Sequence, residues 1–174
     1  MSIPEPDPTA ARAPLAEAQL RALVIDLAAR PERWRGHVAH DPARRLFTRL
    51  HLDEQLELWL ICWMAGHDTG LHDHGGSCGA AAVVEGSVHE ERYVRRLLTG
   101  EREYRAGDAL AFSPRVVHRV RHAGVTPAVT LHAYSPPLRG TRAYAVDERG
   151  DWHVVPVRDD EELRPVRAAA AGAA

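Results

Sequence analysis

Residues 66–79 read GHDTGLHDHGGSCG, and a further glycine follows at position 86 after six intervening residues. His72 and His74 stand two residues apart in this stretch. Successive side chains of a β-strand alternate between its faces, so both imidazoles would lie on one face and converge on one point. This is the spacing of two metal ligands. The stretch therefore indicates a metal site built on a strand.

A third ligand would have to come from a strand elsewhere in the chain. His118 and His132 are the candidates, because each lies in a run of β-type residues well downstream. A histidine pair alone is weak evidence in a chain that holds 11 histidines. The structural alternative is a polar strand end whose imidazoles bond to Asp73 or to water.

The rest of the chain also has the pattern of strands. Short apolar runs separated by turn residues follow one another with no helix between them, which indicates an all-β sandwich or barrel. Turns are expected at the glycines between the runs, including Thr99-Gly100. Trp59 and Trp63 would line the inside of the barrel. The expected strands are 45–52, 56–64, 80–84, 87–94, 109–112, 118–122, 128–134 and 152–157.

Helices are expected only near the N-terminus. Apolar residues recur at intervals of three and four from Leu15 to Arg30, which predicts one amphipathic helix, and a second short helix is expected over 31–37. Four prolines within residues 1–14 predict a mobile tail, and 159–174 are expected to form a flexible C-terminal tail. Residues 15–158 would then form a single domain with short helices packed outside the barrel.

Composition excludes several classes of function. The 174 residues include 22 basic and 24 acidic side chains, so the net charge is −2 and no basic surface for nucleic acid is expected. No apolar stretch is long enough to span a membrane, and the N-terminus lacks the pattern of a secretory signal. We therefore expect a cytoplasmic protein whose Cys62 and Cys78 are free thiols. Every basic residue is arginine, which excludes chemistry through a lysine Schiff base.

The spacing of glycine and histidine resembles the first signature of the cupin superfamily. Gly66 and Gly86 frame the His-x-His pair without an insertion, and Gly107, Pro114 and His118 resemble the second signature in order. The resemblance implies an all-β fold, a cupin β-barrel or jelly roll with short N-terminal helices packed outside.

One position departs from most metal-binding cupins, which have a glutamate ligand where this chain has Gly79. A cupin without that glutamate resembles the cysteine dioxygenase family. Ile61-Cys62-Trp63 and the run AVTLHAYSPP at 128–137 are also similar to that family. Members of the mammalian type link the active-site tyrosine to a cysteine at the position of Gly79, so no crosslink is expected here. Cys78 would face away from Tyr134.

The resemblance also implies roles for particular residues. The ligands of an Fe(II) ion would be His72, His74 and His118. Thr130, His132 and Tyr134 would form the family's relay of hydroxyl, imidazole and phenol, and Tyr134 would also contact the substrate. Arg49 falls where family members that accept cysteine place the arginine that binds its carboxylate.

The implied activity is that of a cysteine dioxygenase, which converts L-cysteine and O2 to cysteine sulfinic acid. The partners would be a small thiol and O2, and we expect a monomer with no nucleic-acid or membrane partner. The nearest alternative is a 3-mercaptopropionate dioxygenase with the same fold and iron site, which carries out the same reaction on a thiol without the amine. Such relatives tend to carry glutamine at the position of Arg49, so Arg49 is the residue that discriminates between the two. Arg139 or Arg142 would then be candidates to hold the carboxylate. A cupin that binds a metal or ligand without turnover is the alternative from another class.

Overall fold

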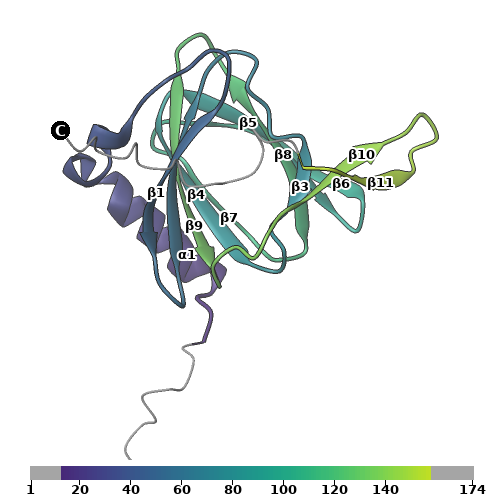
Figure 1. The fold of residues 1–174 in the computed structure, drawn as a ribbon, viewed down its shortest axis with the longest axis horizontal. Helices are drawn as coiled ribbons and strands as arrows, with labels where there is room; N and C mark the ends of the chain where they lie inside the picture. The colour runs from purple at the N-terminus through teal and green to yellow at the C-terminus, as the bar shows by residue number, and fades with distance from the viewer. Residues whose placement is uncertain (1–12, 158–174) are drawn as a thin grey trace, which may run out of the picture.

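The computed structural model describes residues 13–157. In this part of the chain, eleven strands form two antiparallel sheets that face each other and enclose a barrel (Figure 1). One sheet has the strand order β1-β2-β9-β4-β7, and the other has the order β11-β10-β3-β8-β5-β6. The elements are α1 (Glu17–Ala28), the 3-10 turns η1 (Pro31–Arg33) and η2 (Arg35–His37), and the strands β1 (Leu46–Leu52), β2 (Glu57–Trp63), β3 (Leu71–Asp73), β4 (Cys78–Glu85), β5 (Ser87–Val94), β6 (Leu97–Arg105), β7 (Ala109–Phe112), β8 (Val116–Ala123), β9 (Ala128–Ser135), β10 (Arg142–Val146) and β11 (Trp152–Val155).

The helix lies outside the barrel, as expected. In Figure 1, α1 lies against the outer side of the sheet that contains β4 and β9. Leu20 and Val24 of α1 are fully buried there. The opposite face of the same sheet points inward, and Trp59 and Trp63 are both 1% exposed in the interior cluster. Alternation along β2 therefore gives the sheet two buried faces. None of the helices in residues 13–157 has the length and apolar character needed to cross a bilayer.

The predicted strands are present, but the strands β6 and β10 were not expected. The turn predicted at Thr99-Gly100 is wrong, since both residues lie inside β6. β6 is an edge strand with almost every residue exposed, so its sequence lacks the alternation that marks a half-buried strand. The real turn is Arg95-Arg96, whose φ angles of 51° and 67° are normally adopted by glycine or asparagine.

The predicted tails lie largely outside the described residues. Of residues 1–14 only 13 and 14 are described, and none of residues 159–174 is described. Just before α1, the backbone N–H of Leu15 donates to Ser135 Oγ at 2.8 Å, which ties the start of the helical segment to β9. Cys62 and Cys78 are both free thiols, as predicted.

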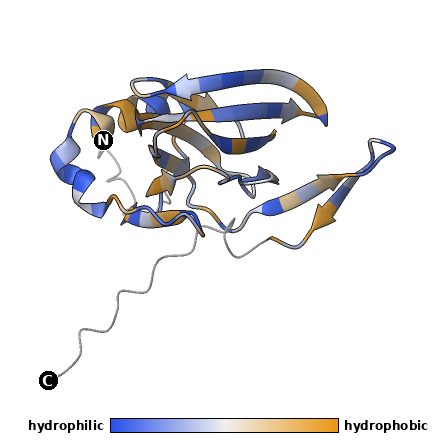
Figure 2. Ribbon diagram, turned by 90° about the horizontal axis from the view of Figure 1, so that it is seen from above, coloured by the Kyte–Doolittle hydropathy of each residue, from blue (hydrophilic) through white to orange (hydrophobic). Residues whose placement is uncertain are grey.

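A hairpin of β10 and β11 stands out from the barrel and carries both polar and apolar residues (Figures 1 and 2). It joins the barrel where β10 pairs with β3, and Arg142 lies opposite Asp73 in that pairing. Arg142 Nε and the Tyr144 hydroxyl donate to Asp73 Oδ2 at 3.0 and 2.6 Å. Asp73 therefore ties the hairpin to the strand that carries the histidine pair.

The interior leaves no room for a side chain at Gly79. A Cβ atom at this position would overlap the ring of Phe112, which is 1% exposed and tightly packed. A cysteine here, and hence a bond to Tyr134, would require Phe112 to shift. Cys78 instead packs with the cluster under α1, on the other face of β4.

We expect Gly79→Ala to destabilise the protein by about 1–3 kcal/mol through overpacking, measured by chemical denaturation. Gly100→Ala is the matched control, because a Cβ at this strand glycine would meet nothing within 4 Å. Adding Phe112→Leu to Gly79→Ala should recover part of the loss. Equal stability of the Gly79→Ala and Gly100→Ala proteins would contradict the packing described here.

Candidate metal centre

Three histidine rings meet inside the barrel. His72 lies in β3 directly opposite His118 in β8, and His74 follows two residues after His72 on the same face. The ring centroids are 4.7 to 5.0 Å apart, and one nitrogen from each ring lies within 4.8 Å of the others. Of the two candidates for the third position, the structure thus places His118 beside the pair, while His132 is bonded elsewhere.

Two of the rings are oriented by acceptors outside the cluster. His118 Nδ1 donates to Glu90 at 2.7 Å, and His72 Nδ1 donates to the carbonyl oxygen of Gly70 at 3.2 Å. In each ring this leaves Nε2 to face the centre. Glu90 is 3% exposed and is itself held by Arg92 at 3.0 Å. A carboxylate behind a ligating imidazole is the usual way that proteins fix the ring and its tautomer.

Glu90 was missed in the sequence. Its signal was the alternation Val88, Glu90, Arg92 within an expected strand, which puts a carboxylate on the same face as a core valine. A buried carboxylate must have partners, and here these are a histidine and an arginine from the barrel wall.

The donor set suits a divalent transition metal. Burial lowers the pKa of His72 to about 4, and it also holds the pKa of His74 and of His118 well below the usual range. All three rings are therefore neutral, with lone pairs available. His74 Nδ1 is buried without a hydrogen-bond partner in the described part of the chain. Imidazole ligands favour iron, zinc, nickel or copper over magnesium or calcium.

The alternative in which Asp73 satisfies the imidazoles is wrong. Asp73 points to the other side of β3, where Arg142 and Tyr144 bind its carboxylate. Arg142 is thereby fixed outside the histidine cluster, with 65% of its side chain exposed. Arg139 is exposed as well.

A hydrogen-bonded chain runs along the inner face of β9 beside the histidines. Trp63 Nε1 donates to Thr130 Oγ1 at 2.8 Å, and Thr130 Oγ1 lies 2.8 Å from His132 Nε2. The Tyr134 hydroxyl lies 3.2 Å from His132 Nδ1. The Tyr134 ring stacks on His74 with 5.3 Å between centroids, so the chain ends at the metal cluster.

One arrangement of protons leaves the phenol of Tyr134 as a hydrogen-bond donor. An indole N–H can only donate, so Thr130 Oγ1 accepts from Trp63, and the Thr130 hydroxyl proton is available for His132 Nε2 when that nitrogen is unprotonated. Burial lowers the pKa of His132 to about 3, which keeps the ring neutral, and in this arrangement its single proton lies on Nδ1. That proton is donated to the Tyr134 oxygen. In this arrangement the phenol proton of Tyr134 is not used within the chain and lies beside the histidine cluster.

Two arginines at the edge strand β1 lie against tryptophans of the barrel interior. Arg49, singled out in the sequence, lies with its guanidinium carbon 5.6 Å over Trp59 and its Nη1 3.5 Å from Glu57. Arg45 was not singled out, yet it is only 5% exposed and lies 5.0 Å over Trp63.

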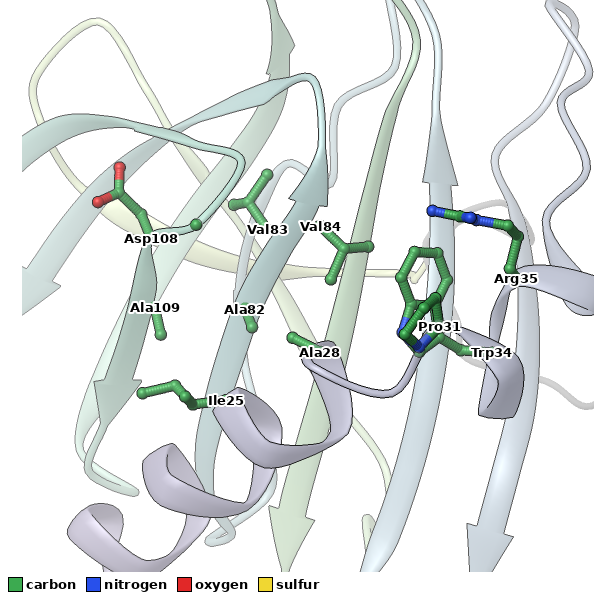
Figure 3. Close-up of a pocket in the computed structure, with 11 residues that line it drawn as sticks. Ile25, Ala28, Pro31, Trp34, Arg35, Ala82, Val83, Val84, Asp108 and Ala109 are labelled. Atoms are coloured by element: carbon green, nitrogen blue, oxygen red, sulfur yellow. The ribbon is translucent and has the colours of Figure 1, made fainter.

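Two other features lie away from the three histidines. A pocket of about 390 Å³ opens between the helical segment and β4 and β7 on the outer side of the sheet (Figure 3). It contains no metal-ligand cluster among the described residues. His89, Glu91 and Glu101 also cluster, but Arg121 already binds Glu91 at 2.9 Å. The interior histidines are therefore the best candidate site.

We expect Glu90→Gln to weaken metal binding about 10-fold or more, because the carboxylate that orients His118 is lost. Competition against a metal-sensitive dye with Co(II) or Zn(II) measures this. Glu103→Gln is the control, since Glu103 is also paired with an arginine at 3.1 Å but lies on exposed β6. Unchanged affinity in both variants would show that Glu90 does not support the site.

Comparison with known proteins shows the family to which this chain belongs. Residues 11–148 match the family model of cysteine dioxygenase type I. Cysteine dioxygenase type 1 of Danio rerio is 28% identical over 149 residues, which cover 78% of this chain and 72% of the fish protein. The human protein of the same name is 27% identical over 143 residues, covering 75% of this chain and 70% of its own length.

Solved structures share the fold at lower identity. A protein from Thermus thermophilus has a TM-score of 0.52 at 20% identity and covers 59% of this chain and 92% of its own. An oxalate oxidase in complex with glycolate has a TM-score of 0.53 at 16% identity, covering 60% and 59%. A cupin superfamily protein from Desulfitobacterium hafniense has a TM-score of 0.51 at 11% identity, covering 59% and 87%. The expected cupin barrel is thus confirmed, and with the match over residues 11–148 this chain belongs to the cysteine dioxygenase type I family.

Proposed function

We propose that this chain is an iron(II)-dependent thiol dioxygenase that converts L-cysteine and O2 to cysteine sulfinic acid. The observation that carries the proposal is the meeting of two sets of residues in one buried interior. Three neutral histidines form one set, and a tyrosine hydroxyl held through His132 and Thr130 forms the other. Tyr134 joins the two sets, because its ring stacks on His74. Membership of the cysteine dioxygenase type I family supports the reaction class.

The reaction needs no further reductant or oxidant. The thiol R–SH takes both atoms of O2 and becomes R–SO2H, so the electrons come from sulfur. Fe(II) held by His72, His74 and His118 would supply the coordination sites and the redox chemistry that join thiolate and O2. Because the three rings are neutral, they bring no negative charge that would repel a substrate thiolate.

The relay leaves one proton, that of the Tyr134 hydroxyl, beside the histidine cluster. Burial raises the pKa of Tyr134, so its phenol stays protonated at neutral pH and acts as a hydrogen-bond donor. In the arrangement described above, His132 would donate to the phenol oxygen and fix where the hydroxyl points. The substrate's amine or carboxylate is the group that this proton would contact.

Arg49 is proposed to bind the substrate carboxylate. Its guanidinium is held by Glu57, which is 4% exposed and also accepts from the backbone N–H of Leu138 at 2.9 Å. One third of the Arg49 side chain is exposed, so the guanidinium lies at the border between the interior and solvent. A planar guanidinium there favours thiols that carry a carboxylate over simple thiols such as cysteamine.

Oxygen consumption tests the proposal. The Fe(II)-loaded protein is supplied separately with L-cysteine, 3-mercaptopropionate and cysteamine, and the products are identified by mass. We expect O2 uptake and sulfinate with L-cysteine. A preference for 3-mercaptopropionate would keep the reaction but change the substrate, and no uptake with any thiol would contradict a dioxygenase.

We expect Tyr134→Phe to lower kcat for L-cysteine by about 10²-fold, since the proton donor is lost while the ring remains. Tyr93→Phe is the control, because the Tyr93 hydroxyl bonds Glu91 on the outer side of β5. Metal content and thermal stability are measured on both proteins. If the Tyr134→Phe protein is as active as the Tyr93→Phe protein, the Tyr134 hydroxyl takes no part in the reaction.

A further inference from the structure

L-Cysteine and 3-mercaptopropionate differ in one group, the amine. Both carry a thiol and a carboxylate, so the contact of a guanidinium with the carboxylate is open to both acids and is closed only to cysteamine. A site that prefers L-cysteine over 3-mercaptopropionate therefore gains from a further side chain that contacts the amino group. An amino group is recognised by a carboxylate or another strong acceptor.

Glu57 is a buried carboxylate on the inner side of the barrel. It begins β2, and alternation places it on the same face as Trp59 and Trp63, which belong to the interior cluster. Only 4% of Glu57 is exposed. A carboxylate is costly in such a place unless it has partners, and neither the three histidines nor the relay uses it.

Glu57 lies next to the phenol of the relay. In the antiparallel pairing of β2 with β9, Glu57 is directly opposite Tyr134. Opposite residues on one face of a sheet have Cβ atoms about 5 Å apart, so the two side chains are neighbours. The Tyr134 ring in turn stacks on His74, with 5.3 Å between centroids. Glu57 is therefore the neighbour of the ring that contacts the histidine cluster.

The two oxygens of the Glu57 carboxylate have different partners. Oε2 accepts from the backbone N–H of Leu138 at 2.9 Å, and the Leu138 side chain packs against the interior cluster. This bond fixes the direction of the carboxylate. Oε1 lies 3.5 Å from Arg49 Nη1, a distance at which opposite charges attract without forming a good hydrogen bond.

Arg49 and Glu57 Oε1 both keep hydrogen-bonding capacity for a ligand. Among residues 13–157, the Arg49 guanidinium donates no hydrogen bond and Glu57 Oε1 accepts none. Arg49 is placed by the charge of Glu57 and by the Trp59 ring, whose centroid is 5.6 Å from the guanidinium carbon. A donor and an acceptor of opposite charge thus lie side by side, and an α-amino acid carries the complementary pair on one carbon atom.

We propose that Glu57 is a specificity-determining residue, whose Oε1 accepts from the amino group of an α-amino thiol acid while Arg49 binds the carboxylate. An amine N–H can donate to Oε1 whether or not the nitrogen is protonated. 3-Mercaptopropionate has no such donor, and its carboxylate at Arg49 would lie near the like charge of Glu57, which disfavours it. The assignment rests on the proposed function for its substrate class, and it favours L-cysteine between the two acids.

Binding without turnover tests this role. The Fe(II)-loaded protein is kept free of O2, and the Kd values of L-cysteine, 3-mercaptopropionate and cysteamine are measured by calorimetry. Glu57→Gln should raise Kd about 10-fold for the two thiols that carry an amine, because the charged acceptor is lost. It should lower Kd for 3-mercaptopropionate several-fold, because the repulsion is lost as well. Glu54→Gln is the control, since Glu54 is exposed in the turn between β1 and β2, and it should change none of the three constants.

A second variant covers a failure of Glu57→Gln to fold. Glu57→Asp keeps the charge but draws the carboxylate back by one methylene, so its preference for L-cysteine over 3-mercaptopropionate should lie between those of wild type and Glu57→Gln. An unchanged preference in either variant would overturn the proposal, and so would an equal loss of affinity for all three thiols, which is the mark of a merely structural role. Wild-type protein that binds L-cysteine but never consumes O2 would overturn the proposed reaction, and the Kd ratios would still decide the role of Glu57.

Discussion

The arrangement of the site depends on one pairing between two strands. His72 in the three-residue strand β3 lies opposite His118 in β8, and this pairing brings together ligands from distant parts of the sequence. Alternation then places His74 beside them without any further contact being needed. Asp73, between the two histidines, points outward and is held by Arg142 and Tyr144. The same short segment therefore faces inward to a metal site and outward to the hairpin that secures the strand.

Burial explains most of the remaining arrangement. Polar groups in a dry interior are costly unless they are hydrogen-bonded, and several of those around the site have a partner that also orients them. Glu90 lies between His118 and Arg92, Thr130 lies between Trp63 and His132, and Glu57 holds Arg49. The contacts that stabilise these groups in the interior also orient the His118 ring, the Thr130 hydroxyl and the Arg49 guanidinium.

The sequence predicted the parts of this arrangement that depend on spacing along one strand. The histidine pair and most strands follow from alternation and turn residues. The relay was implied by the family resemblance, and alternation places its positions 130, 132 and 134 on one face. What it could not show depends on pairing between strands: Glu90 behind His118, Phe112 over Gly79, and Arg45 over Trp63. β6 was missed because an exposed edge strand has no hydrophobic alternation, and its turn uses two arginines in place of glycine. Arg142 was a candidate to hold the substrate carboxylate. The structure pairs it instead with Asp73 outside the histidine cluster, a partner that the sequence alone does not identify.

The central claim is that three neutral histidines and a fixed phenol serve the transfer of both oxygen atoms of O2 to a thiol. The most direct measurement is mass spectrometry of the product formed from L-cysteine by the iron-loaded protein under ¹⁸O2. The account predicts cysteine sulfinic acid in which both sulfinate oxygens are ¹⁸O. A sulfinate that carries one labelled oxygen or none, or a disulfide as the only product, would contradict it.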